Sequence, residues 1–104
     1  MKFILNAFSL NMIGNFPATV TVEEVSTGDA SGMANGVTSG VGHADTAAVF
    51  ASVLGVPVPM NRATVSLVSG DRVLVGQYVG PRLAEGATTL PEGATIKWLV
   101  VSVN

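Results

Sequence analysis

The sequence predicts an α+β fold in one domain, with a mixed sheet of five or six strands flanked by helices. Two observations support this. Short segments with apolar residues at alternate positions, typical of strands, recur along the chain, and one segment after His43 has apolar residues at helical spacing. Glycine and proline separate these segments, and a length of 104 residues fits one compact domain, 1–104.

The predicted strands are short apolar or alternating runs bounded by turn residues. They cover residues 2–7, 18–26, 37–41, 63–68, 72–79 and 95–103. We expect the strands at 63–68 and 72–79 to form a hairpin, because only the turn residues Ser69-Gly70-Asp71 separate them. The alternation in 18–26 predicts a half-buried strand.

A first, poor helix is predicted to start at Ser26 or Thr27 and to end at Asn35-Gly36. Gly28 and Gly32 weaken it by roughly 1 kcal/mol each relative to alanine.

A second helix follows His43, with Asp45 or Thr46 as the expected N-cap and Gly55 as its end. Ala47, Phe50, Ala51 and Leu54 form one apolar face, and Val49 and Val53 lie elsewhere on the cylinder. We expect the sheet to cover one side of this helix and a partner subunit to cover another.

The composition points to self-association. Hydrophobic residues make up 48% of the chain, and charged residues make up 12%, about half of the ~25% usual in soluble domains. Few charges leave apolar surface exposed, which usually marks an interface. We therefore expect a two-fold homodimer.

Charge and hydropathy exclude several classes of partner. The net charge is −2 with five basic residues, too few for the many phosphate contacts that long nucleic acid requires. No apolar stretch is long enough to span a membrane, and polar residues interrupt the first apolar run too early for a signal peptide. We expect a soluble intracellular protein.

The chain has no cysteine and only one histidine, so neither a disulfide nor a thiolate metal site is possible. No cluster has metal-ligand spacing, and no Gly-x-Gly-x-x-Gly or Walker-type loop is present. We expect neither a metal nor another cofactor.

His43 is the first candidate for chemistry. It follows small residues (Ser39, Gly40 and Gly42) and precedes a helix. A lone titratable base in such a turn is a candidate general acid or base, although it can equally make structural hydrogen bonds. The positive end of the helix dipole disfavours an imidazolium, so a phosphate or a carboxylate would have to compensate.

Other polar residues suit an anionic ligand. Arg82, three residues before Glu85 in a stiff loop, could hold a phosphate, or the two could form an exposed ion pair worth under ~1 kcal/mol. Arg62 could meet a phosphate or lie on the surface. Asn6, Ser9 and Asn11 could contact bases and riboses, or could make local turn hydrogen bonds.

Together these residues resemble a known family. The matching segments are Leu5-Asn-Ala-Phe-Ser-Leu-Asn-Met12, Gly42-His43, Thr46-Ala47, Leu54-Gly-Val-Pro57, Asn61-Arg62, Gln77 and Gly80-Pro-Arg-Leu-x-Glu-Gly86. In this order they are similar to the viral ring nucleases, over nearly the whole chain. This sequence departs from the family pattern in two places. Segment 27–35 is glycine-rich where a charged, well-formed helix is expected, and Ala84 stands where proline is usual.

The resemblance implies a two-fold dimer that binds cyclic tetra-adenylate, the messenger of type III CRISPR defence, in a cleft between subunits. It implies metal-independent cleavage to linear di-adenylate in the cytoplasm of a prokaryotic host. His43, Arg82 and Glu85 match the catalytic residues of the family. The positions that match its ligand contacts are Asn6, Ser9, Asn11, Arg62 and Gln77.

Two other functions remain possible from the sequence. One is a protein that sequesters the cyclic nucleotide without cutting it. The other is a structural protein whose apolar helix only mediates assembly.

Overall fold

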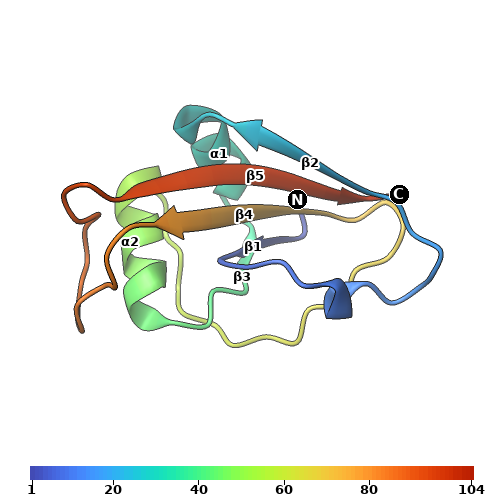
Figure 1. The fold of residues 1–104 in the computed structure, drawn as a ribbon, viewed down its shortest axis with the longest axis horizontal. Coiled ribbons are helices and arrows are strands. Elements are labelled where there is room, and N and C mark those ends of the chain that lie inside the picture. The colour runs from blue at the N-terminus through green and yellow to red at the C-terminus, as the bar shows by residue number, and fades with distance from the viewer.

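The computed structural model describes residues 1–104, and a five-stranded mixed sheet forms its centre (Figure 1). The strand order is β2–β5–β4–β1–β3. The strands are β1 (Phe3–Leu5), β2 (Val20–Val25), β3 (Thr38–Ser39), β4 (Arg72–Val79) and β5 (Thr95–Val103). β1 pairs in parallel with β3 and β4, whereas β5 pairs antiparallel with β2 and β4. The α+β prediction is confirmed.

The predicted hairpin of 63–68 with 72–79 is wrong. β4 pairs with β5 on one edge, from Arg72 opposite Ser102 to Val79 opposite Thr95, and with β1 on the other. No edge of β4 is left for the preceding segment. That segment makes a single bridge, between Leu67 and Ile13. The turn before β4 was predicted correctly, since Asp71 N–H donates to the Val68 carbonyl at 3.0 Å.

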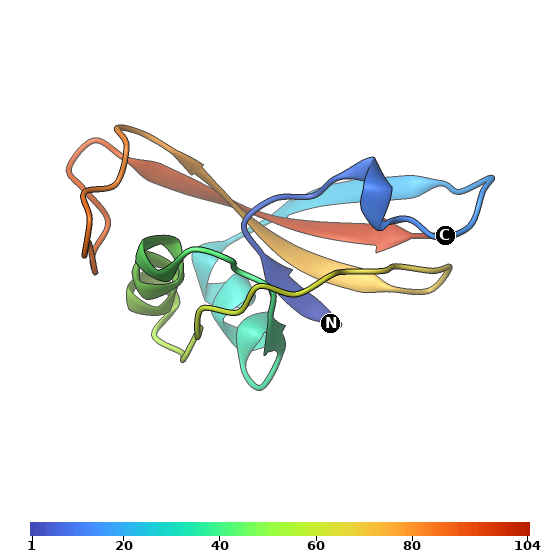
Figure 2. The ribbon, with the colours of Figure 1, turned by 90° about the horizontal axis from the view of Figure 1, so that it is seen from below.

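Two helices, α1 (Thr27–Ala34) and α2 (Ala44–Leu54), lie together on one side of the sheet (Figure 2). α1 starts at Thr27, one of the two predicted positions, and Ser26 caps it by accepting a hydrogen bond from Asp29 N–H at 3.1 Å. Gly55 ends α2 in the left-handed conformation, with φ 70°. The prediction of Asp45 or Thr46 as the α2 N-cap is wrong, because the helix already starts at Ala44 and His43 is the N-cap.

The core between helices and sheet centres on Phe50 and Trp98, whose rings meet edge to face with centroids 4.9 Å apart. Gly76 makes room for this pair, because a Cβ there would lie 2.5 Å from Phe50 and 2.6 Å from Trp98. Val49 is also fully buried. The side of α2 that carries Val49 is thus covered within the chain, whereas cover by a partner subunit stays a prediction.

The other sheet face carries a second core cluster that includes Leu5, Val73 and Val101. Val65 and Leu67, from the segment that was expected to be a strand, cover part of this face. β2 forms as predicted but is less buried than expected: residues 21–24 are all exposed, including Val22 at 55%. Apolar surface therefore remains open on the face away from the helices.

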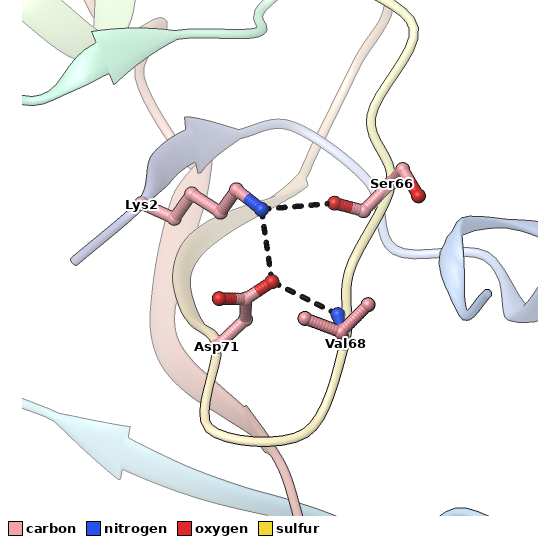
Figure 3. A network of polar contacts seen from close by, with 4 residues as sticks. All are labelled: Lys2, Ser66, Val68 and Asp71. Atoms are coloured by element: carbon pink, nitrogen blue, oxygen red, sulfur yellow. Dashed lines mark hydrogen bonds and ion pairs between the residues drawn. The ribbon is translucent and has the colours of Figure 1, made fainter. Parts of the chain in front are cut away.

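A polar network joins the first residues of the chain to the turn before β4 (Figure 3). The Lys2 ammonium lies 2.9 Å from Asp71 Oδ2 and also donates to the Ser66 carbonyl, and Asp71 accepts from Val68 N–H at 2.9 Å. The Val68 hydrogen bond, followed by the one from Lys2, lowers the pKa of Asp71.

Neither helix has the length and apolar character needed to cross a bilayer.

Candidate functional site

The largest cavity, about 740 Å³, lies where the start of α2 meets the loop that follows β4. We call it the His43 pocket. Its lining residues are His43, Asp45, Thr46, Tyr78, Gly80, Arg82, Leu83 and Glu85. All three residues that the sequence singled out as catalytic line this one cavity, although about forty residues separate His43 from the other two.

His43 reaches this pocket because β3 ends at Ser39 and a short extended connection leads to α2. Its backbone is extended (φ −126°, ψ 128°), and its side chain makes no capping hydrogen bond. The imidazole is thus exposed and free to contact a ligand. It stands beside the unpaired N–H groups of the first helical turn, which favour an anion.

Arg82 and Glu85 lie on the loop 80–86, which is attached near both ends. At its start, the Tyr78 hydroxyl donates to the Pro81 carbonyl. At its end, Gly86 N–H donates to Asp45 Oδ1 at 3.0 Å. Gly80 packs closely on Ala94, the residue before β5, so that a Cβ at Gly80 would lie 2.6 Å from the Cβ of Ala94.

Arg82 and Glu85 do not pair with each other. The Lys2–Asp71 contact is the ion pair of the chain, and both loop residues are exposed. The alternative of a loop ion pair is therefore not what the structure shows. A guanidinium and a carboxylate face the pocket without a partner, so both are available to a bound molecule.

Arg62 lies next to the His43 pocket, although it does not line it. Its Nε donates to the Gly42 carbonyl at 3.1 Å, directly before His43. Asn61 fixes this segment, since its side chain donates to the Ser39 carbonyl at 2.7 Å and its N–H donates to the Val41 carbonyl at 2.8 Å. Only Nε of Arg62 is engaged, so its two Nη nitrogens are free to hold a phosphate near His43.

Asn6 and Gln77 lie elsewhere. Both line a second, mostly apolar cavity of about 320 Å³ on the sheet face away from the helices, which we call the sheet groove. Its other lining residues are Ala7, Phe8, Val22, Val75, Leu99 and Val101. Successive strand residues point to opposite faces, so Gln77 faces the sheet groove and Tyr78 faces the His43 pocket.

Ser9 and Asn11 line neither cavity. They belong to a 3₁₀ turn, η1 (Leu10–Met12), and Ser9 Oγ accepts from Asn11 N–H at 3.3 Å. This is the local turn bonding that the sequence left open for Ser9. The Asn11 side chain is exposed. Ligand contact by either residue stays a prediction.

Sequence reasoning missed Tyr78 and Asp45 as residues of the site. Asp45 was considered only as a helix cap, and its bond to Gly86 joins residues 41 positions apart, which no local pattern reveals. For Tyr78 a signal existed: it is the polar aromatic residue near the end of a strand that leads into the Arg82 loop. No group of three or more His, Cys, Asp or Glu side chains is placed to hold a metal ion.

Comparisons with known proteins agree with this architecture. The model of the STIV B116-like family matches residues 2–97. Among solved structures, B116 of Sulfolobus turreted icosahedral virus superposes with a TM-score of 0.78 and 26% sequence identity, covering 96% of this chain and 97% of that protein. The search among curated protein sequences found no match.

Proposed function

Because the chain belongs to the STIV B116-like family, a family of viral proteins, we propose that it is a viral ring nuclease. It would bind cyclic tetra-adenylate and cut it, without a metal, to linear di-adenylate, which ends type III CRISPR signalling. The observation that carries this proposal is the meeting of His43, Arg82 and Glu85 in one exposed pocket of about 740 Å³. The imidazole of His43, the guanidinium of Arg82 and the carboxylate of Glu85 together have the chemistry that phosphodiester cleavage needs.

The reaction can proceed by an internal attack. The ribose 2′-oxygen bonds to the adjacent phosphorus and loses its proton, and the bond from phosphorus to the 5′-oxygen breaks. The departing 5′-oxygen needs a proton, which the His43 imidazolium donates. Glu85, which has no partner, can accept the 2′-hydroxyl proton or orient Arg82. Arg82 stabilises the negative charge that develops on the phosphate.

The position of His43 at the start of α2 suits this role. The positive end of the helix dipole disfavours an imidazolium next to it, whereas a phosphate held there supplies the compensating negative charge. Arg62 lies against Gly42 and can grip the same or a neighbouring phosphate. A phosphate bound here would therefore lie between His43 and Arg62.

A second copy of the chain completes the site in this proposal. Within one chain, Asn6 and Gln77 lie in the sheet groove, apart from the His43 pocket. The sheet groove is mostly apolar. On the strands that form this face, the side chains of Val22 and Val79 are 55% and 52% exposed. Packing two such faces about a two-fold axis would bury this surface and bring two sets of polar residues to one ring with two-fold symmetry.

The direct test is incubation of the purified chain with labelled cyclic tetra-adenylate in the presence of a chelator. We expect conversion to linear di-adenylate, and slower or no conversion of other ring sizes. If the ring stays intact at stoichiometric protein but raises the melting temperature, the chain sequesters the messenger. An intact ring and no thermal shift with any cyclic oligoadenylate would favour a purely structural role.

A further inference from the structure

The loop that carries Arg82 and Glu85 has little internal structure to fix it. Within the whole connection between β4 and β5, the backbone bonds are those from Ala87 N–H to the Ala84 carbonyl and from Ala94 N–H to the Pro91 carbonyl. The connection projects past the end of the sheet, beside α2 (Figures 1 and 2). What holds Arg82 and Glu85 near His43 must therefore come from outside the loop.

Two side chains provide that hold. Tyr78, the second-to-last residue of β4, donates a hydrogen bond from its hydroxyl to the Pro81 carbonyl. Asp45, in the first turn of α2, accepts from Gly86 N–H at 3.0 Å. Arg82 and Glu85 lie between these two attachment points, one residue inside each. Asp45 is also two residues after His43. The start of α2 therefore both places the imidazole in the pocket and binds the loop that carries Arg82 and Glu85.

We propose that Asp45 and Tyr78 are positioning residues, which hold the loop 80–86 so that Arg82 and Glu85 face His43. The hydrogen bond to a carboxylate makes Asp45 the stronger of the two, because charge-assisted hydrogen bonds are about twice as strong as neutral ones. The kinetic part of this inference rests on the proposed ring-opening activity, whereas the attachment itself does not.

Amide hydrogen exchange at Gly86, followed by NMR in the full chain, tests the attachment without any ligand. Asp45→Ala removes the acceptor and should speed exchange at Gly86 by about tenfold, which corresponds to one lost hydrogen bond. Asp45→Asn keeps an acceptor oxygen and should change exchange less than about threefold. Unchanged exchange at Gly86 in Asp45→Ala would overturn the proposal.

Asp29→Ala is the matched control. Asp29 is also an acidic residue in the first turn of a helix, and its carboxylate holds no loop. Removing it costs α1 the same favourable interaction with the helix dipole that Asp45→Ala costs α2. Exchange at Gly86 and turnover should both stay at the wild-type value in Asp29→Ala, so any effect specific to Asp45 comes from the loop.

Kinetics test whether the attachment positions the reacting groups. Misplacing a catalytic group by about 1 Å can cost roughly 100-fold in rate, so we expect Asp45→Ala to lower kcat by about 10- to 100-fold with a KM within about threefold. Asp45→Asn should restore most of kcat. Tyr78→Phe, which keeps the ring and loses the hydroxyl, should lower kcat by up to about tenfold.

Faster exchange at Gly86 together with wild-type kcat in Asp45→Ala would show an attachment that positions nothing, and would overturn the proposal. If the wild-type chain cuts no ring, the ring-nuclease proposal fails, and the positioning role in catalysis fails with it. Exchange at Gly86 still decides in that case whether Asp45 holds the loop.

Discussion

Lys2 Nζ lies 2.9 Å from Asp71 Oδ2, so the first residues of the chain are tied to the turn that starts β4 (Figure 3). The same carboxylate oxygen accepts from Val68 N–H, and this bond closes the turn. The contact lies beside β1, the strand that joins β3 to β4 in the sheet. Loss of this contact would loosen the start of β1 and the start of β4 together.

We predict that Asp71→Ala lowers the free energy of unfolding at neutral pH by about 1–2 kcal/mol, from the lost turn bond and the half-exposed ion pair. Asp71→Asn keeps an acceptor for Val68 N–H and should cost about half as much. Lys2→Met, which removes only the ammonium, should cost under ~1 kcal/mol. Urea denaturation of the three variants measures these differences, and equal costs for Asp71→Ala and Lys2→Met would contradict the role of the turn bond.

The contribution of Asp71 should depend on pH in a defined direction. Its pKa is lowered in the folded chain, so the folded state favours the charged carboxylate. The stabilisation is complete above the pKa of an unfolded aspartate, about 3.9, and is lost as the pH falls through the lower folded value. The difference in unfolding free energy between wild type and Asp71→Ala should therefore be constant from pH 7 to 5 and shrink below pH 4. A difference that grows on acidification would refute this.

Gly76 should not tolerate a side chain. A Cβ would lie within 2.7 Å of atoms of both Phe50 and Trp98, and neither ring can move aside in the packed core. Overpacking of this kind costs about 1–3 kcal/mol, and each kcal/mol lowers the melting temperature of a domain of this size by roughly 4–8 °C. We expect Gly76→Ala to melt about 5–15 °C lower than wild type, measured by circular dichroism.

Gly32→Ala is the control for that change. A Cβ at Gly32 meets nothing within 4 Å, and the residue lies within α1. Alanine is favoured over glycine in a helix by about 0.5–1 kcal/mol, so this variant should melt at a higher temperature. Equal melting temperatures for the two variants would show that the Phe50–Trp98 contact does not depend on Gly76.

His43→Asn separates catalysis from helix capping. His43 occupies the N-cap of α2 without a capping hydrogen bond, and asparagine is among the best N-cap residues. The variant should thus be as stable as wild type or more stable. Under the proposed mechanism it should still bind cyclic tetra-adenylate while single-turnover cleavage falls by about 10²–10⁴-fold. Wild-type cleavage by His43→Asn, or by His43→Ala, would exclude His43 as the general acid.

Local patterns predicted most of the secondary structure. The start of α1, the end of α2 at Gly55 and the turn at 69–71 each depend on residues a few positions apart, and all three were predicted correctly. The hairpin failed because β-pairing is non-local: β5, sixteen residues beyond β4, occupies the edge that the neighbouring segment was expected to take.

The site was predictable to a similar extent. A histidine at a helix start and an arginine in a stiff loop could be singled out from their residue types and neighbours. That both would line one pocket could not be read from the spacing, since the Asp45–Gly86 bond spans 41 residues. The division between the His43 pocket and the sheet groove was equally hidden, because it depends on which face of β4 turns toward the helices.

The open face of the sheet offers the last test, which concerns the proposed dimer. Val22 is 55% exposed and lines the sheet groove. If two copies pack through this face, Val22→Glu places two carboxylates in an apolar interface about the two-fold axis, at a cost of several kcal/mol. Wild type should then sediment with twice the 10.6 kDa mass of the chain, and Val22→Glu with the single mass. Met60→Glu is the matched control, because Met60 is 50% exposed but does not line the sheet groove. It should leave the dimer intact, and a Val22→Glu chain that remains dimeric would place the interface elsewhere.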